Sequence, residues 1–78
     1  MKELVIHIQP TLFTYQGYII DGHEQKSVSV PLNMANIATF ADMQEINTIT
    51  LCGNANYIKG VQKQLSEKTT IPINLLEV

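Results

Sequence analysis

Seven acidic side chains are the residues of this chain that could hold a catalytic metal ion. Metal-assisted phosphoryl displacement needs several carboxylates that converge on the ions. The centre of the first predicted strand and the end of the fourth have His7 and Cys52, and neither of these is an acid. The acids fall instead at predicted turns, helix surfaces and element ends: Glu3, Asp21, Glu24, Asp42, Glu45, Glu67 and Glu77. We therefore predict no catalytic residues, no metal site, no cofactor and no enzymatic activity.

A Gly-Asn turn in front of a predicted helix is a second place where the sequence offers ligand chemistry. The amides of Gly53, Asn54 and Ala55 would lie at the helix N-terminus, where the helix dipole favours an anion such as phosphate. The same residues also form an ordinary strand-to-helix turn in which Asn54 caps the helix. A small nucleotide-binding or phosphate-binding domain is therefore the alternative function.

The other reactive or aromatic side chains form no recognisable catalytic or nucleic-acid-binding pattern in the sequence. Cys52 has no general base beside it in the sequence, so we expect a buried core thiol, and we expect His7 to be structural. The aromatic residues Phe13, Tyr15 and Tyr18 could stack bases on a sheet. However, a net charge of -2 with five Lys plus Arg gives no basic groove, so we predict no binding to duplex nucleic acid.

Length and composition indicate one small domain, residues 1–78. Charged residues make up 15% of the chain, against roughly 25% in typical soluble domains, which hints at faces covered by a partner. A single cysteine favours a reducing compartment. No stretch approaches the roughly 20 apolar residues that span a bilayer, and MKELVIHIQP lacks the long apolar run of a signal peptide. We expect a cytoplasmic protein that binds no membrane, short enough to be phage-encoded.

The first half of the chain predicts an antiparallel meander followed by a helix. Strands are expected over Glu3–Gln9, Leu12–Ile20 with a bulge at Gly17, and Ser27–Val30, with a turn at Asp21-Gly22. Asn33 should cap a helix that ends near Glu45. Its core side should carry Met34, Ile37, Ala38 and Ala41, with Phe40 and Met43 beside them.

The last third of the chain predicts a strand, a helix and a closing strand. Residues 47–52 are short, β-branched and apolar, and residues 71–78 alternate well enough to form a second strand. Between them, the three- and four-residue spacing of Tyr57, Ile58, Val61 and Leu65 predicts the buried side of an amphipathic helix. A strand, helix, strand unit of this length implies a parallel pair.

These elements predict a two-layer α/β fold with a five-stranded mixed sheet in the spatial order 3-2-1-4-5, which is ribonuclease-H-like in topology. Both helical crossovers run in the same direction across the sheet and should both be right-handed. The two helices should therefore lie on one face of the sheet, and the other face should have no cover from this chain.

The stretch ITLCGNANYIKGVQKQLSEKTTIPINLLEV resembles the final strand, glycine turn, helix and strand of actin-like ATPase domains, in particular the bacterial cell-division and type IV pilus assembly members. The resemblance implies a ribonuclease-H-like fold. In those domains the phosphate turn after the first strand resembles Asp-x-Gly-x-x-x-Thr, whereas this chain has His7-Ile8-Gln9-Pro10-Thr11. The acid and the glycine are both replaced, and Pro10 removes an amide donor, so we expect no ATP hydrolysis.

The uncovered face is the predicted place of function. It should hold Val5, His7 and Gln9 from the first strand and Phe13 and Tyr15 from the second. Apolar and aromatic side chains exposed over several strands often mark a partner surface, although an antiparallel sheet can also simply be solvated on one side. We therefore expect a protein-interaction module that uses Val5, His7, Phe13 and Tyr15 to bind a second copy of itself, as a homodimer, or another protein.

Overall fold

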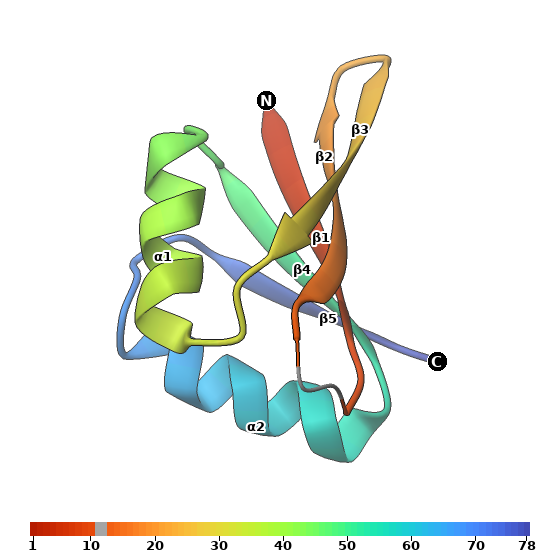
Figure 1. Ribbon diagram of the computed structural model, residues 1–78, viewed down its shortest axis with the longest axis vertical. Coiled ribbons are helices and arrows are strands. Elements are labelled where there is room, and N and C mark those ends of the chain that lie inside the picture. The colour runs from red at the N-terminus through yellow and green to blue at the C-terminus, as the bar shows by residue number, and fades with distance from the viewer. Residues whose placement is uncertain (11–12) are drawn as a thin grey trace.

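A computed structural model describes residues 1–10 and 13–78 of the chain. Within them, five strands and two helices form two layers (Figure 1). In chain order they are β1 Lys2–Ile8, β2 Tyr15–Asp21, β3 Glu24–Val30, α1 Met34–Met43, β4 Thr48–Gly53, α2 Ala55–Ser66 and β5 Ile73–Glu77.

The strands lie side by side in the order β3-β2-β1-β4-β5, which confirms the predicted topology. The pairs β1 with β2 and β2 with β3 are antiparallel, whereas β4 runs parallel to both β1 and β5. A two-residue loop joins β2 to β3, because Asp21 is paired with Glu24. Gly22 takes the first central position with φ 63°, a left-handed conformation that glycine adopts without steric cost.

One hydrophobic core lies between the sheet and both helices. From the strands it takes alternate residues such as Leu4, Ile6 and Ile8, and from the helices it takes residues such as Ile37 and Ile58, all at most 5% exposed. Since successive strand residues point to opposite faces, this single cluster places α1 and α2 on the same face of the sheet. The prediction of one covered and one uncovered face is confirmed for the described residues (Figure 1).

Both helices begin at the predicted asparagine. Asn33 Oδ1 accepts a hydrogen bond from the Asn36 amide at 3.2 Å, and Asn54 Oδ1 accepts one from the Asn56 amide at 3.0 Å. Each asparagine thereby satisfies a backbone donor that the first helical turn leaves without an intrahelical acceptor.

Helix α1 ends in a Schellman motif. The Glu45 amide donates to the Asp42 carbonyl at 3.1 Å, and the Ile46 amide donates to the Ala41 carbonyl at 3.0 Å. Glu45 takes the left-handed position at φ 57°, where glycine is the usual residue. Asn47 then ties this end to β1, because its side chain accepts from the Lys2 amide at 2.8 Å and its amide donates to the Lys2 carbonyl at 2.9 Å.

The predicted bulge at Gly17 is wrong. The pairing of β2 runs in step from Tyr15 to Asp21, with Gly17 opposite Ile6 on β1 and Val28 on β3. A Cβ atom at Gly17 would come within 2.8 Å of Val30 Cγ2, so the glycine makes room for core packing. The predicted start of this strand at Leu12 lies outside the described residues.

The apolar sides of the helices are narrower than predicted. On α2, Ile58 and Leu65 are buried and Val61 is partly buried, but Tyr57 is 51% exposed. Met43, at the end of α1, is 76% exposed. A short helix on one face of a small sheet buries a stripe about one side chain wide, and residues beside that stripe stay in contact with water.

Candidate functional site on the open sheet face

The strand register fixes which residues lie on the face that has no helix. The central row across the sheet contains Ser27, Tyr18, Val5, Thr50 and Asn74. A second row contains Ser29, Gln16, His7, Cys52 and Leu76, and a third contains Gln25, Ile20, Glu3 and Thr48. We call these residues the open face.

Apolar side chains lie in the middle of the open face. Val5, Tyr18 and Ile20 are half-buried by their neighbours in the sheet alone. Cys52 is 9% exposed, since it lies between His7 on β1 and Leu76 on β5, and Leu76 is 56% exposed. The strip therefore crosses four of the strands.

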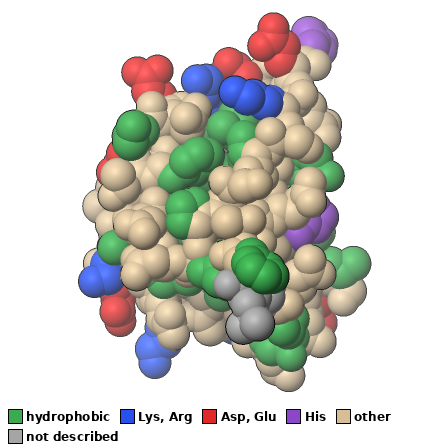
Figure 2. Space-filling model, in the orientation of Figure 1, with side chains coloured by type: hydrophobic (Ala, Val, Ile, Leu, Met, Phe, Trp, Pro, Cys, Tyr) green, Lys and Arg blue, Asp and Glu red, His purple; other side chains and the backbone are tan. Residues whose placement is uncertain are grey.

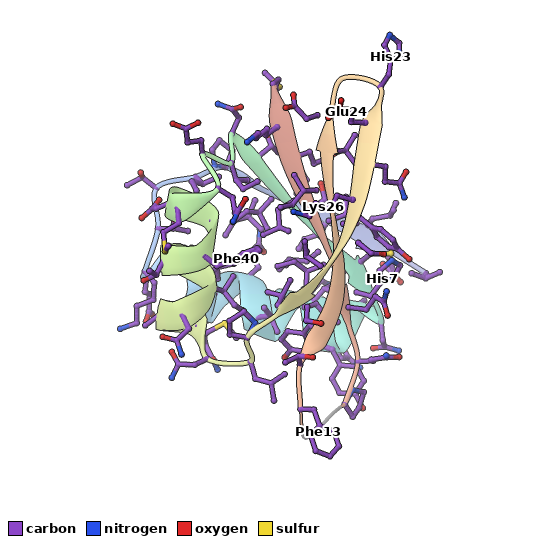
Figure 3. All side chains as sticks on the ribbon, turned by 45° about the horizontal axis from the view of Figure 1, so that its top comes forward. His7, Phe13, His23, Glu24, Lys26 and Phe40 are labelled. Atoms are coloured by element: carbon purple, nitrogen blue, oxygen red, sulfur yellow. The ribbon has the colours of Figure 1, made fainter. Side chains whose placement is uncertain are left out.

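His7 and Tyr18 form an edge-to-face aromatic pair on this face. Their ring centroids lie 5.7 Å apart with an interplanar angle of 80°. Tyr18 is opposite Val5, two residues from His7, so the contact is a diagonal cross-strand pair. Figure 3 shows His7 on the side of the sheet away from α1, whereas Phe40 of α1 lies on the other side. The contact restrains both rings and holds an aromatic surface at the centre of the face.

The polar residues of the open face are mostly small and neutral. The outer strand β3 contributes Gln25, Ser27 and Ser29, all exposed. The acid of this face, Glu3, is partly buried, and its carboxylate accepts a hydrogen bond from the Thr50 hydroxyl at 2.5 Å. Because this hydrogen bond partly satisfies the carboxylate, covering the face costs less than covering a solvated charge.

Two of the predicted interface residues lie on the open face and one does not. Val5 and His7 are there, as the alternation of β1 predicts. The placement of Tyr15 is wrong, because Tyr15 is paired with the buried Val30 and packs against the core. Phe13 precedes β2 and is 82% exposed, and Figure 3 shows it at the tip of the β1–β2 connection.

Tyr18 and Ile20 of β2 lie on the open face, although the sequence did not predict them there. The signal lay in β3, where Ser27 and Ser29 alternate with Val28 and Val30. A two-residue hairpin loop after Asp21 puts Val30 opposite Tyr15 and Ser27 opposite Tyr18. The apolar valines of β3 pack on the core side of the sheet. Because paired residues share a face, Tyr15 lies on the core side with Val30, and Tyr18 lies on the open face with Ser27.

Directly after the Gly53-Asn54-Ala55 turn, the cap and the helix use the next three backbone amides. The Asn56 amide donates to the Asn54 side chain, and the Tyr57 and Ile58 amides donate to the Asn54 carbonyl at 3.0 Å each. Gly53 is needed for packing, since a Cβ atom there would lie 2.5 Å from the Ile8 carbonyl oxygen. The geometry of the turn is explained by strand-to-helix packing, with no ligand required.

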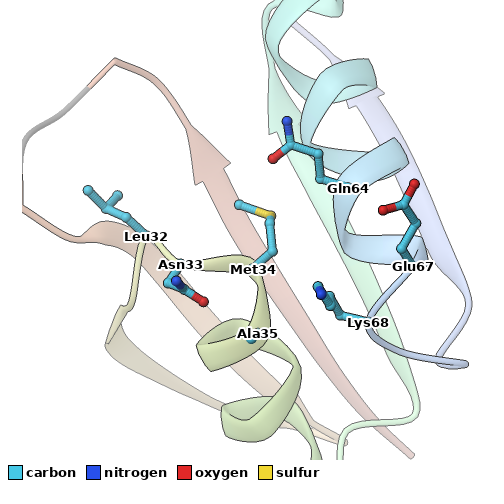
Figure 4. Close-up of a pocket in the computed structure, with 7 residues that line it drawn as sticks. All are labelled: Leu32, Asn33, Met34, Ala35, Gln64, Glu67 and Lys68. Carbon is cyan, nitrogen blue, oxygen red and sulfur yellow. The ribbon is translucent and has the colours of Figure 1, made fainter.

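The remaining hollows are shallow and have mixed linings. One hollow, of about 500 Å³, lies between the start of α1 and the end of α2 (Figure 4). Met34 and Gln64 line it together with the oppositely charged Glu67 and Lys68. Figure 2 shows charged side chains around the periphery of the molecule, with both signs mixed and no basic patch on the face in view.

Residues 1–10 and 13–78 contain neither a metal-ligand cluster nor a helix suited to span a membrane. No group of three or more His, Cys, Asp or Glu side chains in that part of the chain could hold a metal ion. None of its helices has the length and apolarity needed to cross a bilayer.

Comparison with known proteins gives no match: no protein-family model fits the chain, and neither the curated proteins nor the solved structures contain a significant relative.

Proposed function

We propose that this chain is a non-enzymatic protein-interaction module that binds a second copy of itself or another protein through the open face. The observation that carries the proposal is a sheet whose helices cover one side only, with an apolar strip on the other side. Val5, Tyr18, Ile20, Cys52 and Leu76 form this strip, and small polar residues of β3 border it.

The make-up of the open face suits a protein partner. Protein interfaces typically combine an apolar, aromatic-rich centre with a polar rim. Here Tyr18, restrained by His7, would be the central anchor, and the serines of β3 would form part of the rim. Tyrosine contributes a large contact area at a low entropic cost, which is why it is common among residues that dominate binding energy.

The positions that would carry chemistry in related topologies favour binding over catalysis. His7 and Cys52 stand side by side on β1 and β4, where a metal-dependent nuclease would need acids. We place this module in the cytoplasm, because its single cysteine is free and buried and calls for no oxidising compartment. The resemblance to actin-like domains stays a prediction about the fold and adds no activity.

The experiment compares two exchanges of tyrosine for glutamate. Tyr18→Glu puts a charge at the centre of the open face, and Tyr57→Glu makes the same change on α2, where Tyr57 is 51% exposed. Sedimentation equilibrium on the pure chain, and pull-down with tagged chain, measure binding to itself and to other proteins. We expect Tyr18→Glu to weaken binding at least about tenfold, as a buried unpaired charge would, and Tyr57→Glu to have no effect. A chain that is monomeric and binds no protein in a Tyr18-dependent way would overturn the proposal.

A further inference from the structure

The two edges of the sheet are protected to different extents. The outer edge of β3 carries Glu24 and Lys26, and Pro31 follows the strand directly. Charged side chains and proline discourage pairing with another strand. The other edge, β5, has the sequence Ile-Asn-Leu-Leu-Glu, and Leu75 and Leu76 are 36% and 56% exposed. Pro72 directly precedes this strand and Glu77 is its one charged residue, but the strand itself contains neither lysine nor proline, so β5 is the less protected edge.

The backbone directions in β5 are set by its hydrogen bonds to the neighbouring strand. The Pro72 carbonyl accepts from the Ile49 amide at 2.9 Å, and the Val78 amide donates to the Gly53 carbonyl at 3.0 Å. Because backbone groups alternate in direction along a strand, those of Ile73, Leu75 and Glu77 point away from β4. Among the described residues, no strand pairs with that outer side.

We infer that β5 pairs antiparallel with β5 of a second copy of this chain, about a two-fold axis at Leu75. In this register Ile73 lies opposite Glu77 of the second copy, Leu75 lies opposite Leu75 of the second copy, and Glu77 lies opposite Ile73 of the second copy. All three opposed pairs bring outward-pointing backbone groups together, and they exchange about six hydrogen bonds. A register shifted by two residues loses at least one of these pairs.

Charge complementarity selects a second copy as the occupant of this edge. Ile73 and Glu77 lie on the helix-covered side, in register with Ile49 and Gly53 of β4. Beside Ile73, a hollow of about 350 Å³ is lined by Gln62, Lys63 and Ser66 of α2. The antiparallel register directs Glu77 of the second copy toward this hollow, where Lys63 can pair with it. The two-fold axis forms the pair twice, and the two Glu77 side chains lie at opposite ends of the junction.

This pairing goes beyond the proposed function and leaves the open face free. A two-fold axis perpendicular to the sheet keeps the helices of both copies on the same side. The open faces then join into one continuous surface, with Leu76 of each copy near the junction. Edge pairing would therefore double the surface available to a protein partner.

A proline exchange tests the edge directly. Leu75→Pro removes the central outward amide without touching a hydrogen bond to β4, a position where an edge strand tolerates proline. The control is Ala55→Pro at the first helical position of α2, which lies outside the open face and β5 and where a helix tolerates proline. By analytical ultracentrifugation, Leu75→Pro should raise the dimer dissociation constant about 10-fold to 100-fold, and Ala55→Pro should leave it unchanged. Circular dichroism establishes that each variant is folded.

A charge exchange at exposed positions keeps the test valid if a proline variant does not fold. Glu77→Lys and Lys63→Glu should each weaken the dimer about fivefold, and the double variant should restore it. A monomeric wild-type chain, or a dimer insensitive to both sets of changes, would overturn the edge pairing. A dimer lost with Tyr18→Glu and kept with Leu75→Pro would also overturn it, while supporting association through the open face.

Discussion

Replacing Gly53 with alanine separates the two explanations of the Gly-Asn turn. If the glycine is there to let backbone amides approach an anion, its loss should matter only when the anion is present. If the glycine is there because β1 passes close by, replacing it should destabilise the protein even when no anion is present. The structure favours the second explanation, since an added Cβ atom would lie 2.5 Å from the Ile8 carbonyl oxygen.

The expected cost of Gly53→Ala is large for a chain of this size. The clash is with backbone atoms of a central strand, so it cannot be relieved by rotating a side chain. Overpacking of this kind typically costs about 1–3 kcal/mol, and we expect the upper half of that range. Each kcal/mol changes the melting temperature of a 60–100-residue domain by roughly 4–8 °C, so the midpoint should fall by about 10–20 °C.

Gly60 is the matched control for Gly53. It lies in the interior of α2, and an added Cβ atom would meet nothing within 4 Å. Gly60→Ala should therefore raise the free energy of unfolding by about 0.5–1 kcal/mol, because alanine is the better helix former. The assay is thermal and urea unfolding followed by circular dichroism, in buffer with and without phosphate. The packing explanation would be refuted if Gly53→Ala were as stable as wild type, or if it were less stable than wild type only in the buffer with phosphate.

Two other predictions concern the helix termini. Glu45→Gly should raise the free energy of unfolding by about 0.5–1 kcal/mol, because glycine suits the left-handed end of α1. Glu67→Gly, at the right-handed end of α2, should lower it. Urea titrations compare the two, and equal effects would contradict the Schellman assignment. Phosphate, ATP and GTP at millimolar concentration should leave the melting temperature unchanged, since the close approach of Gly53 to Ile8 explains the turn without an anion. A rise that depends on ligand concentration would instead support the anion-binding alternative.

The overall arrangement was predictable because hydrophobic periodicity indicates which segments are strands or helices and which of their sides are buried. Alternation in β1 puts Leu4, Ile6 and Ile8 on one side, and the fold confirms that side as the core. The order of strands and helices then leaves few topologies, and the rule for crossover connections puts both helices on one face. These parts depend on patterns that extend over many residues, so an error at one position does not change them.

The membership of the open face was harder to predict because it depends on the register of a single strand. β2 contains apolar or aromatic residues at both odd and even positions, so Tyr15 and Tyr18 look equally suited to either side. A one-residue difference in phase exchanges the two faces. The predicted burial of Cys52 is confirmed. Its position on the open face was not predicted, since it depends on the pairing with His7 and Leu76 on two other strands.

The most direct test of the central claim is the mass of the protein in solution as a function of Tyr18. With pairing through β5 blocked by Leu75→Pro, sedimentation equilibrium over a wide concentration range, together with pull-down, should show an assembly larger than the 8.7 kDa chain that Tyr18→Glu dissociates and Tyr57→Glu preserves. Particles of one chain at every concentration, with no bound protein whose recovery depends on Tyr18, would contradict the account.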